Sequence, residues 1–320
     1  MLKKIAQSIR DNENIIEKKE LSPIVEYITS NSFKNETKIF SDIGEDSAAI
    51  KNNDKYTLIT TDRIKTSFVE NFPFGAGFSS ILVGVDDIYC CGGIPLAASI
   101  ILSFSDRNIG QKIIEGICEG SNKFNIPIIR GHTNTTSKCY ELSSTVIGEI
   151  NKEDYMSAKT AQIDDNIILV VDFNGRVGKA SKFYYDTTTY KDSEEVLRAR
   201  RSMNVIAKKH LVNASKDVSN GGIFGTLLQL INYSNVGANV NIKDITIPPV
   251  LKNLKYTLEI YIQMYLTTSY ILTAPDENCD QLIKTFKEYG LNANVIGKII
   301  KEQHLLKIND GNESLDVIKI

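Results

Sequence analysis

The segment 76–104 constrains the fold most, because it joins a long apolar helix to a buried strand. Large apolar side chains fall on one broad face of a helix that we predict over 76–91. Gly92-Gly93 ends this helix, and 96–104 is predicted as a buried strand. Two adjacent acids, Asp86 and Asp87, lie inside the apolar helix, where neither can serve as a cap. The segment therefore predicts packed helix and sheet layers with unusual negative charge close to the core.

The rest of the chain alternates between short apolar strands and amphipathic helices. Helices are predicted in the first ~35 residues, with a second short helix after Ser22-Pro23, and at 109–124, 193–210, 223–233 and 277–289. Strands are predicted at 47–50, 56–61, 126–131, 140–150, 167–171, 238–242, 270–274 and 293–299. This order predicts an α+β fold, built as α/β sandwich-like layers in two domains. A polar stretch at 151–165 sets the boundary within about 151–160, which gives domains 1–153 and 154–320.

Composition excludes several classes of protein. The chain has 320 residues and a net charge of −2, so its charge balance does not indicate a nucleic-acid partner. It contains no apolar run of about 18 residues, and its first 20 residues are charged and amphipathic. We therefore expect a cytoplasmic protein with no membrane partner. Five scattered cysteines indicate reduced thiols, and the adjacent Cys90 and Cys91 are predicted to be buried.

Aspartates of the first half are the main candidates for chemistry. Asp46 precedes a predicted strand, Asp62 ends one, and Asp86-Asp87 lies within the apolar helix. A carboxylate in apolar surroundings needs a cation or hydrogen-bond donors to offset its lost hydration. Magnesium is the natural cation for a set of oxygen ligands. The alternative is that these acids cap turns, strands or helices, and the residues alone leave both interpretations open.

Two polar turns add candidate ligand contacts. The predicted strand 126–129 leads into Arg130, Gly131, His132, Thr133 and Asn134, which can bind phosphate or carboxylate oxygens, or can form an ordinary polar turn. Gly92-Gly93 caps the preceding helix or lets the backbone approach a phosphate.

The segment 216–222 places Asp217, Ser219, Asn220 and two glycines directly before an apolar helix. A helix N-terminus with nearby glycines can bind an anion such as a substrate phosphate, although Ser219 or Asn220 can equally be a plain N-cap. The hydroxyl-rich run 186–191 is interpreted as a solvated loop, with a substrate loop as the alternative.

Five motifs in order resemble those of the aminoimidazole ribonucleotide synthetase superfamily. They are IGEDSAAI, TTDRI, VDDIYCCGGIPLAAS, IIRGHTNT and KDVSNGGIFGTLLQL, and the resemblance covers roughly residues 40–300. That superfamily includes thiamine monophosphate kinase, selenophosphate synthetase and a hydrogenase-maturation dehydratase. The stretch YYDTTTYKD, followed by KDVSNGG, resembles more narrowly the methanogenesis marker 2 proteins.

The resemblance implies specific roles. Asp46, Asp62 and Asp87 match positions that hold magnesium and nucleotide phosphates, and Asp217 matches a functional aspartate. It also implies homodimers in which the N-terminal sheets pair into a shared barrel, with a C-terminal α/β domain beside it. The chain departs from the thiamine kinase pattern at His132 and Asn220, where that kinase has aspartates. It also lacks the reactive glycine-rich segment of selenophosphate synthetase, and Asp86 stands where relatives often carry Ser or Asn.

From these observations we expect a magnesium-dependent, ATP-binding enzyme that phosphorylates or activates a small molecule. The expected catalytic residues are Asp62, Asp87 and His132, and the expected metal ligands are Asp46, Asp62 and Asp87. The expected nucleotide or substrate contacts are Asp46, Gly93, Arg130, Thr133, Asp217 and Asn220. The expected cofactors are ATP and Mg²⁺, and the expected partners are a small-molecule substrate and a second copy of the chain. The alternatives are a non-catalytic nucleotide-binding accessory or assembly protein, and an ATP-dependent cyclase or dehydratase with a phosphorylated intermediate.

Overall fold

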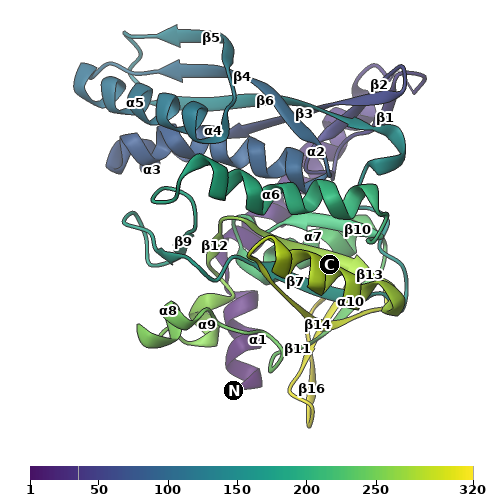
Figure 1. Cartoon of the computed structure of the whole chain (residues 1–320). Helices are drawn as coiled ribbons and strands as arrows, with labels where there is room; N and C mark the ends of the chain where they lie inside the picture. Colours follow the sequence, from purple (N-terminus) through teal and green to yellow (C-terminus); the bar gives the residue numbers. More distant parts are fainter. Residues whose placement is uncertain (35, 320) are drawn as a thin grey trace.

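The computed structural model of the chain describes residues 1–34 and 36–319, with the backbone alone for 19–22 and 26. It contains two sheet-based domains, which lie one above the other in Figure 1. This arrangement confirms the expected mixed α+β fold in two domains. The predicted boundary between 153 and 154 falls in a short 3-10 helix, Lys152–Asp154, and stays a prediction.

The first domain is an open six-stranded sheet in the order β1-β2-β3-β6-β4-β5. Its strands are β1 (Ile39–Ser41), β2 (Ala48–Asn52), β3 (Lys55–Arg63), β4 (Ile94–Ser103), β5 (Ile128–Asn134) and β6 (Glu141–Asn151). Neighbouring strands are antiparallel except for β4 and β5, which are parallel. Helices α4 (Pro73–Cys90) and α5 (Arg107–Phe124) cover one face of the sheet, and the short α3 (Thr66–Asn71) precedes α4 (Figure 1). Within the described residues the sheet stays open and forms no barrel.

The second domain is a seven-stranded sheet in the order β10-β13-β7-β14-β11-β15-β16. Its strands are β7 (Asn166–Val171), β10 (Ala214–Asp217), β11 (Gly237–Asn241), β13 (Ser269–Ala274), β14 (Asn292–Ile300), β15 (Leu305–Asn309) and β16 (Ser314–Lys319). A small sheet holds β8 (Arg176–Val177), β9 (Tyr184–Asp186) and β12 (Tyr265–Leu266). The helices are α6 (Ser193–Lys208), α7 (Gly222–Tyr233), α8 (Pro249–Asn253), α9 (Leu258–Tyr261) and α10 (Asp276–Glu288). Helix α6 lies between the two domains, where it packs against α4, α5 and α10 (Figure 1).

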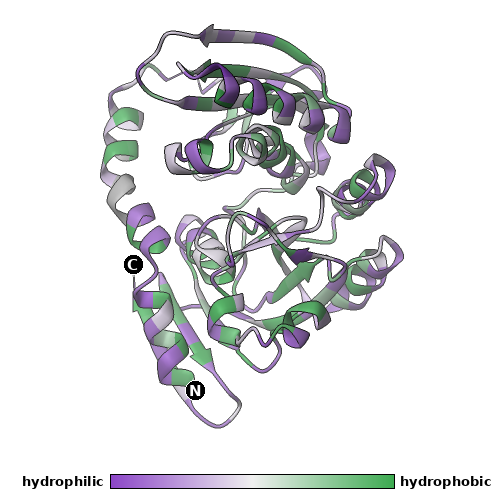
Figure 2. Ribbon diagram, turned by 90° about the vertical axis from the view of Figure 1, so that its left-hand side faces the viewer, coloured by the Kyte–Doolittle hydropathy of each residue, from purple (hydrophilic) through white to green (hydrophobic). Residues whose placement is uncertain are grey.

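The N-terminal helices connect the two domains. Helix α1 (Leu2–Arg10) buries Leu2, Ile5 and Ile9 in the core of the second domain, although its sequence position falls in the predicted first domain. Figure 2 shows α1 beside the second domain and the chain then running up the side of the molecule toward the first. Helix α2 (Glu13–Asn31) is continuous through Pro23, so the predicted second helix after Ser22-Pro23 is wrong. A proline removes one backbone hydrogen bond, and the intact bonds on either side can carry a helix through that loss.

Most of the longer predicted elements are confirmed, including the helix over 76–91, which begins three residues earlier as α4. The predicted strand 126–131 is displaced, because β5 extends to Asn134 and so contains the residues that we expected after its end. Cys90 and Cys91 are buried, as predicted. None of the helices in the described ranges is both long and apolar enough to cross a membrane.

Candidate functional site

Helix α4 presents a single partly exposed stripe. From Ala76 to Cys90 every residue is buried except Ser79, Val83 and Asp87. A spacing of four residues places all three on one face of the helix, and the stripe spans about 12 Å at 1.5 Å per residue. All three side chains line the same cavity. The apolar helix is therefore buried everywhere except along the line that leads to Asp87.

That cavity is a cleft of about 580 Å³ between the two domains. The first domain contributes the end of β3, α3 and the α4 stripe, and α2 contributes Asn14 and Lys18. The second domain contributes residues around Tyr184, Asp217 and Tyr265. Its volume is in the range of small-molecule sites, which commonly lie between domains.

Carboxylates from three separate parts of the chain meet at this cleft. Asp46, Asp87 and Asp217 each offer one oxygen atom, and these atoms lie within 4.8 Å of one another. Asp62, near the end of β3, also lines the cleft, and its carboxylate and that of Asp87 share the Thr60 hydroxyl. Thr60 donates from Oγ1 to Asp87 Oδ2 at 2.5 Å and to Asp62 Oδ2 at 3.4 Å. We call these four aspartates the cleft cluster.

The cleft cluster carries more negative charge than its protein neighbours offset. Burial raises the pKa of Asp87 well above its usual range, and the charges of Asp62, Asp217 and Asp46 raise it further. Burial, followed by the charge of Asp46, raises the pKa of Asp217 to about 8. Burial likewise raises the pKa of Asp62.

One lysine holds the cluster from the second domain. The Lys216 Nζ donates to Asp46 Oδ1, and the backbone N–H of Asp217 donates to Asp46 Oδ2 at 3.2 Å. The ammonium groups of Lys216 and Lys18 both act on the cluster, but two positive charges do not offset four carboxylates. An oxygen-only set with excess negative charge fits Mg²⁺, which prefers carboxylate, water and phosphate ligands.

Asp86 faces away from the cleft. Its carboxylate accepts hydrogen bonds from Arg200 of α6, with Nε to Oδ1 at 2.6 Å and Nη2 to Oδ2 at 3.3 Å. The Arg200 side chain is fully buried. The adjacent acids Asp86 and Asp87 thus differ in role, because one holds two helices together and the other faces the cavity.

The N-terminus of α7 also faces the cleft. Ser219, Asn220 and Gly221 line the cavity. Gly221 and Gly222 have φ values of 98° and 66°, and a Cβ on Gly222 would lie 2.1 Å from the Ile262 carbonyl oxygen. Only glycine tolerates that combination of a left-handed backbone and close approach.

Lys18 is a cleft residue that the sequence did not suggest. Its Nζ donates to Gln229 Oε1 at 2.7 Å and to Ser219 Oγ at 3.3 Å. Burial, followed by the charge of Lys216, lowers the pKa of Lys18 to about 8. No local signal marks Lys18 in its charged stretch, because only the fold brings α2 beside α7.

Three predicted ligand contacts lie elsewhere. Arg130, His132 and Thr133 are exposed on β5. His132 pairs in register with Ile101, which is exposed, whereas its neighbour Ile100 is buried beneath α4 and α5. His132 therefore lies on the face of the first sheet that α4 and α5 leave uncovered, and within one chain it does not join the cleft cluster.

Gly93 lies in the turn after α4. Its backbone N–H donates to the Ile88 carbonyl at 2.9 Å, and that of Gly92 donates to the Tyr89 carbonyl at 2.8 Å. Gly92 has a φ of 81°. These features are those of a helix C-cap. A phosphate contact for Gly93 stays a prediction.

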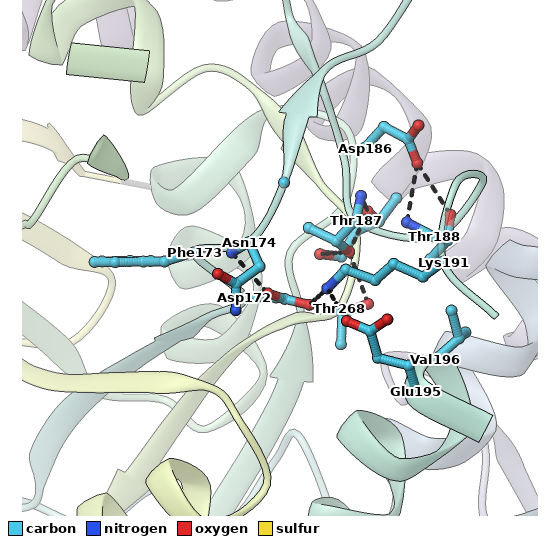
Figure 3. Close-up of polar contacts among 12 residues, drawn as sticks. Asp172, Phe173, Asn174, Asp186, Thr187, Thr188, Lys191, Glu195, Val196 and Thr268 are labelled. Atoms are coloured by element: carbon cyan, nitrogen blue, oxygen red, sulfur yellow. Dashed lines mark hydrogen bonds and ion pairs between the residues drawn. The ribbon is translucent and has the colours of Figure 1, made fainter. Parts of the chain in front are cut away.

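The run 186–191 is not a solvated loop, and that expectation is wrong. Asp186, Thr187, Thr188 and Lys191 are all buried. Figure 3 shows Lys191 pointing to Asp172, with Nζ and Oδ2 2.6 Å apart. The hydroxyls are satisfied internally, because Thr187 bonds to Thr267 and Thr268 and Asp186 accepts from the N–H groups of Thr188 and Thr189. A polar sequence can fill a buried site when its groups bond to one another.

Comparison with known proteins gives consistent matches. The family model described as AIR synthase related protein, N-terminal domain, matches residues 44–150, and the C-terminal domain model matches residues 166–306. An uncharacterized protein of Methanocaldococcus jannaschii is 32% identical over 99% of this chain and 96% of its own length. The thiamine-monophosphate kinase of Buchnera aphidicola is 24% identical over 92% of this chain and 95% of its own length.

Two solved structures have similar folds. Thermotoga maritima PurL complexed with ADP has a TM-score of 0.72 at 15% identity, over 88% of this chain and 46% of PurL. The chain thus spans about half of that protein. AaThiL complexed with AMPPCP and TMP has a TM-score of 0.68 at 19% identity, over 94% of this chain and 98% of AaThiL.

Proposed function

The chain belongs to the AIR synthase related family, and from that premise we propose that it is a magnesium-dependent, ATP-using enzyme that phosphorylates a small molecule. The cleft cluster carries this proposal, because its four carboxylates exceed the positive charge that the protein supplies. Solved structures with the same fold contain ADP or an ATP analogue. A substrate-sized cleft beside the carboxylates gives the acceptor a place to bind.

Each residue of the site has a physical role in this proposal. Asp46, Asp62 and Asp87 would hold the magnesium ion, and Lys216 and Thr60 fix the orientation of Asp46 and Asp87. Asp217 is a further candidate ligand, because one of its oxygens lies within 4.8 Å of oxygens of Asp46 and Asp87. The bound magnesium would offset negative charge that develops on the phosphate oxygens. The N-terminus of α7 faces the cleft, and its helix dipole favours phosphate oxygens there.

The reaction is a phosphoryl transfer. An acceptor oxygen forms a bond to the γ-phosphorus, and the bond from that phosphorus to the β,γ-bridging oxygen breaks. The bonding electron pair stays with ADP, and the acceptor's proton passes to solvent or to a cleft carboxylate.

Magnesium-dependent ATP binding tests the proposal. We expect calorimetry to show binding to the wild type that requires Mg²⁺, and affinity weaker by about 100-fold in Asp87→Asn and Asp62→Asn, because each loses a charged ligand. Asp42→Asn is the matched control, since its side chain is 60% exposed and lies outside the cavity lining. Equal affinities in all four proteins would remove the metal assignment.

Product analysis separates the phosphotransferase from its rivals. ADP with a phosphorylated product supports a kinase. ADP with free phosphate and a dehydrated or cyclised product supports the cyclase alternative, and tight binding without turnover supports the accessory alternative.

We also propose that two chains pair through the uncovered face of the first sheet, which brings Arg130 and His132 to a shared site. Thr133 pairs in register with the buried Leu102 and so lies on the other face. Exposed apolar side chains support this, since Ile101 is 52% exposed and Ile129 is 64% exposed. Sedimentation should show a dimer for the wild type and a monomer for Ile101→Glu. Ile114→Glu on α5, also partly exposed, should stay dimeric, and a monomeric wild type would contradict the proposal.

A further inference from the structure

The cleft has aromatic walls as well as carboxylates. Phe68, Phe72, Phe183, Tyr184 and Tyr265 all line the cavity. They come from both domains, since the first two lie in and after α3 and the others in or next to the small sheet. Phe72 is 39% exposed and Phe183 is 37% exposed. Exposed aromatic side chains that line one cavity mark a surface that binds a partner molecule.

Phe68 and Phe72 lie away from the carboxylates, at the N-terminal end of α4. The α4 stripe leads from Asp87 through Val83 to Ser79, about 12 Å along the helix axis. Phe72 lies beyond Ser79, at the N-cap of α4, and its ring centroid is 6.1 Å from that of Phe68. The cleft therefore extends along α4 from the carboxylates to Phe68 and Phe72.

Two cations of the cleft have no acidic partner. Lys18 donates to Ser219 and Gln229, and Arg63 donates to Thr66 Oγ1 at 2.9 Å. Within the described part of the chain, neither lies within ion-pair distance of a carboxylate. By contrast, Lys65 pairs with Glu17 at 3.4 Å.

An unpaired cation that faces a binding cleft favours an anionic group in the ligand. Arg63 directly follows Asp62, and Lys18 bonds to the segment that follows Asp217. The Arg63 guanidinium also bonds to Thr66 in α3, so the favoured anion lies between the cleft cluster and α3.

We propose that the acceptor molecule is a flat aromatic ring that carries an anionic group, a phosphate or a carboxylate. This inference rests on the proposed function, because it assigns the aromatic end of the cleft to the acceptor. The ring lies between the phenylalanines of the two domains, and the anion bonds to Arg63 and Lys18. The magnesium ion and the start of α7 serve the nucleotide phosphates, so these two additional cations are free for an anion on the acceptor.

Saturation-transfer NMR, which detects the binding of small fragments to the protein, tests the inference. The probe is 1-naphthyl phosphate, which has both ring and anion, and the comparison ligands are 1-naphthol and inorganic phosphate. We expect the probe to bind the wild-type protein about tenfold more tightly than either comparison ligand. A saturating non-hydrolysable ATP analogue with Mg²⁺ should leave probe binding intact.

Variants test which residues bind the ring of the probe and which bind its phosphate. Phe72→Ala and Phe183→Ala should each weaken probe binding by about five- to tenfold, because each removes a ring contact. Arg63→Met and Lys18→Met should reduce the affinity for the probe to that for 1-naphthol. Phe74→Ala is the matched control, since Phe74 is 46% exposed and lies outside the cavity lining.

Two results would overturn the inference. One is equal binding of the three ligands in wild type and variants. The other is displacement of the probe by the ATP analogue, with ATP affinity reduced in Phe72→Ala and Phe183→Ala, because the ring site would then hold the purine. Failure of the proposed function would look different, since ATP would not bind while the probe response would remain.

Discussion

Two groups of aspartates with little solvent exposure differ in how their charge is offset. The cleft cluster gathers Asp46, Asp62, Asp87 and Asp217. The second group, which we call the paired acids, consists of Asp86, Asp172 and Asp186. Burial raises the pKa of both Asp86 and Asp87, but the neighbouring charges act in opposite directions. Arg200 lowers the pKa of Asp86, whereas further carboxylates raise that of Asp87.

The paired acids show what a structural carboxylate looks like in this fold. Asp172 has Lys191, and Asp186 has Arg176 together with donors from Thr188 and Thr189. Burial alone would raise the pKa of Asp186, but the hydrogen bonds outweigh it and the pKa is lowered. The difference teaches that burial by itself does not mark a functional acid. A functional acid is marked instead by a negative charge inside a cleft that the neighbouring groups do not fully offset.

The largest loss of stability should follow from removing the cation that pairs with one of the paired acids. Arg200→Met leaves Asp86 buried without its cation, so we expect a loss of about 3–5 kcal/mol in the free energy of unfolding. Asp87→Asn in the cleft cluster should cause no loss, because it removes an uncompensated charge. Urea denaturation measures both, and Arg201→Met, whose exposed pair with Glu194 contributes under about 1 kcal/mol, is the control. Equal losses for Arg200→Met and Asp87→Asn would erase the distinction between the two groups.

A smaller effect should appear in the pH dependence of the metal-free protein. The pKa of Asp217 is about 8 in the folded chain and 3.8 in the reference state. The folded protein thus holds a proton that the unfolded chain releases, so this contribution is complete below pH 3.8 and is lost as pH rises toward 8. Asp217→Asn removes this pH dependence. At pH 8.5 in EDTA, its free energy of unfolding should exceed that of the wild type by about 1–3 kcal/mol.

Urea unfolding at pH 5.5 and 8.5 measures this difference, with Asp42→Asn as the exposed control. Mg²⁺ should restore the wild-type stability at the higher pH, because a cation replaces the missing proton. If the free energy of unfolding changed with pH in the same way for wild type and Asp217→Asn, the protein itself would already offset the negative charge of the cleft cluster.

Local patterns predicted much of the fold. The helix over 76–91 followed from apolar periodicity with a glycine stop, and the structure has it as α4. The short strands β8, β9 and β12 escaped prediction, since two or three residues carry no periodicity and depend on pairing partners. Pro23 suggests a helix boundary by its local pattern, but α2 continues through it.

The candidate site was predictable only in part. Asp46, Asp62, Asp87 and Asp217 were named from the sequence, and the structure brings them to one cleft. The helical pattern alone could not separate Asp86 from Asp87, because that depends on which helix face meets Arg200, but the family resemblance favoured Asp87. Lys18 and Lys216 were missed, since their partners lie about 170–210 residues away along the chain.

The most direct test of the central claim is a crystal structure with Mn²⁺ and a non-hydrolysable ATP analogue, with data collected at the manganese absorption edge. The account predicts an anomalous peak at the cleft cluster, about 2.0–2.3 Å from carboxylate oxygens of Asp46, Asp62 or Asp87 and from phosphate oxygens of the nucleotide. Nucleotide bound elsewhere, with no anomalous peak among these aspartates, would contradict it.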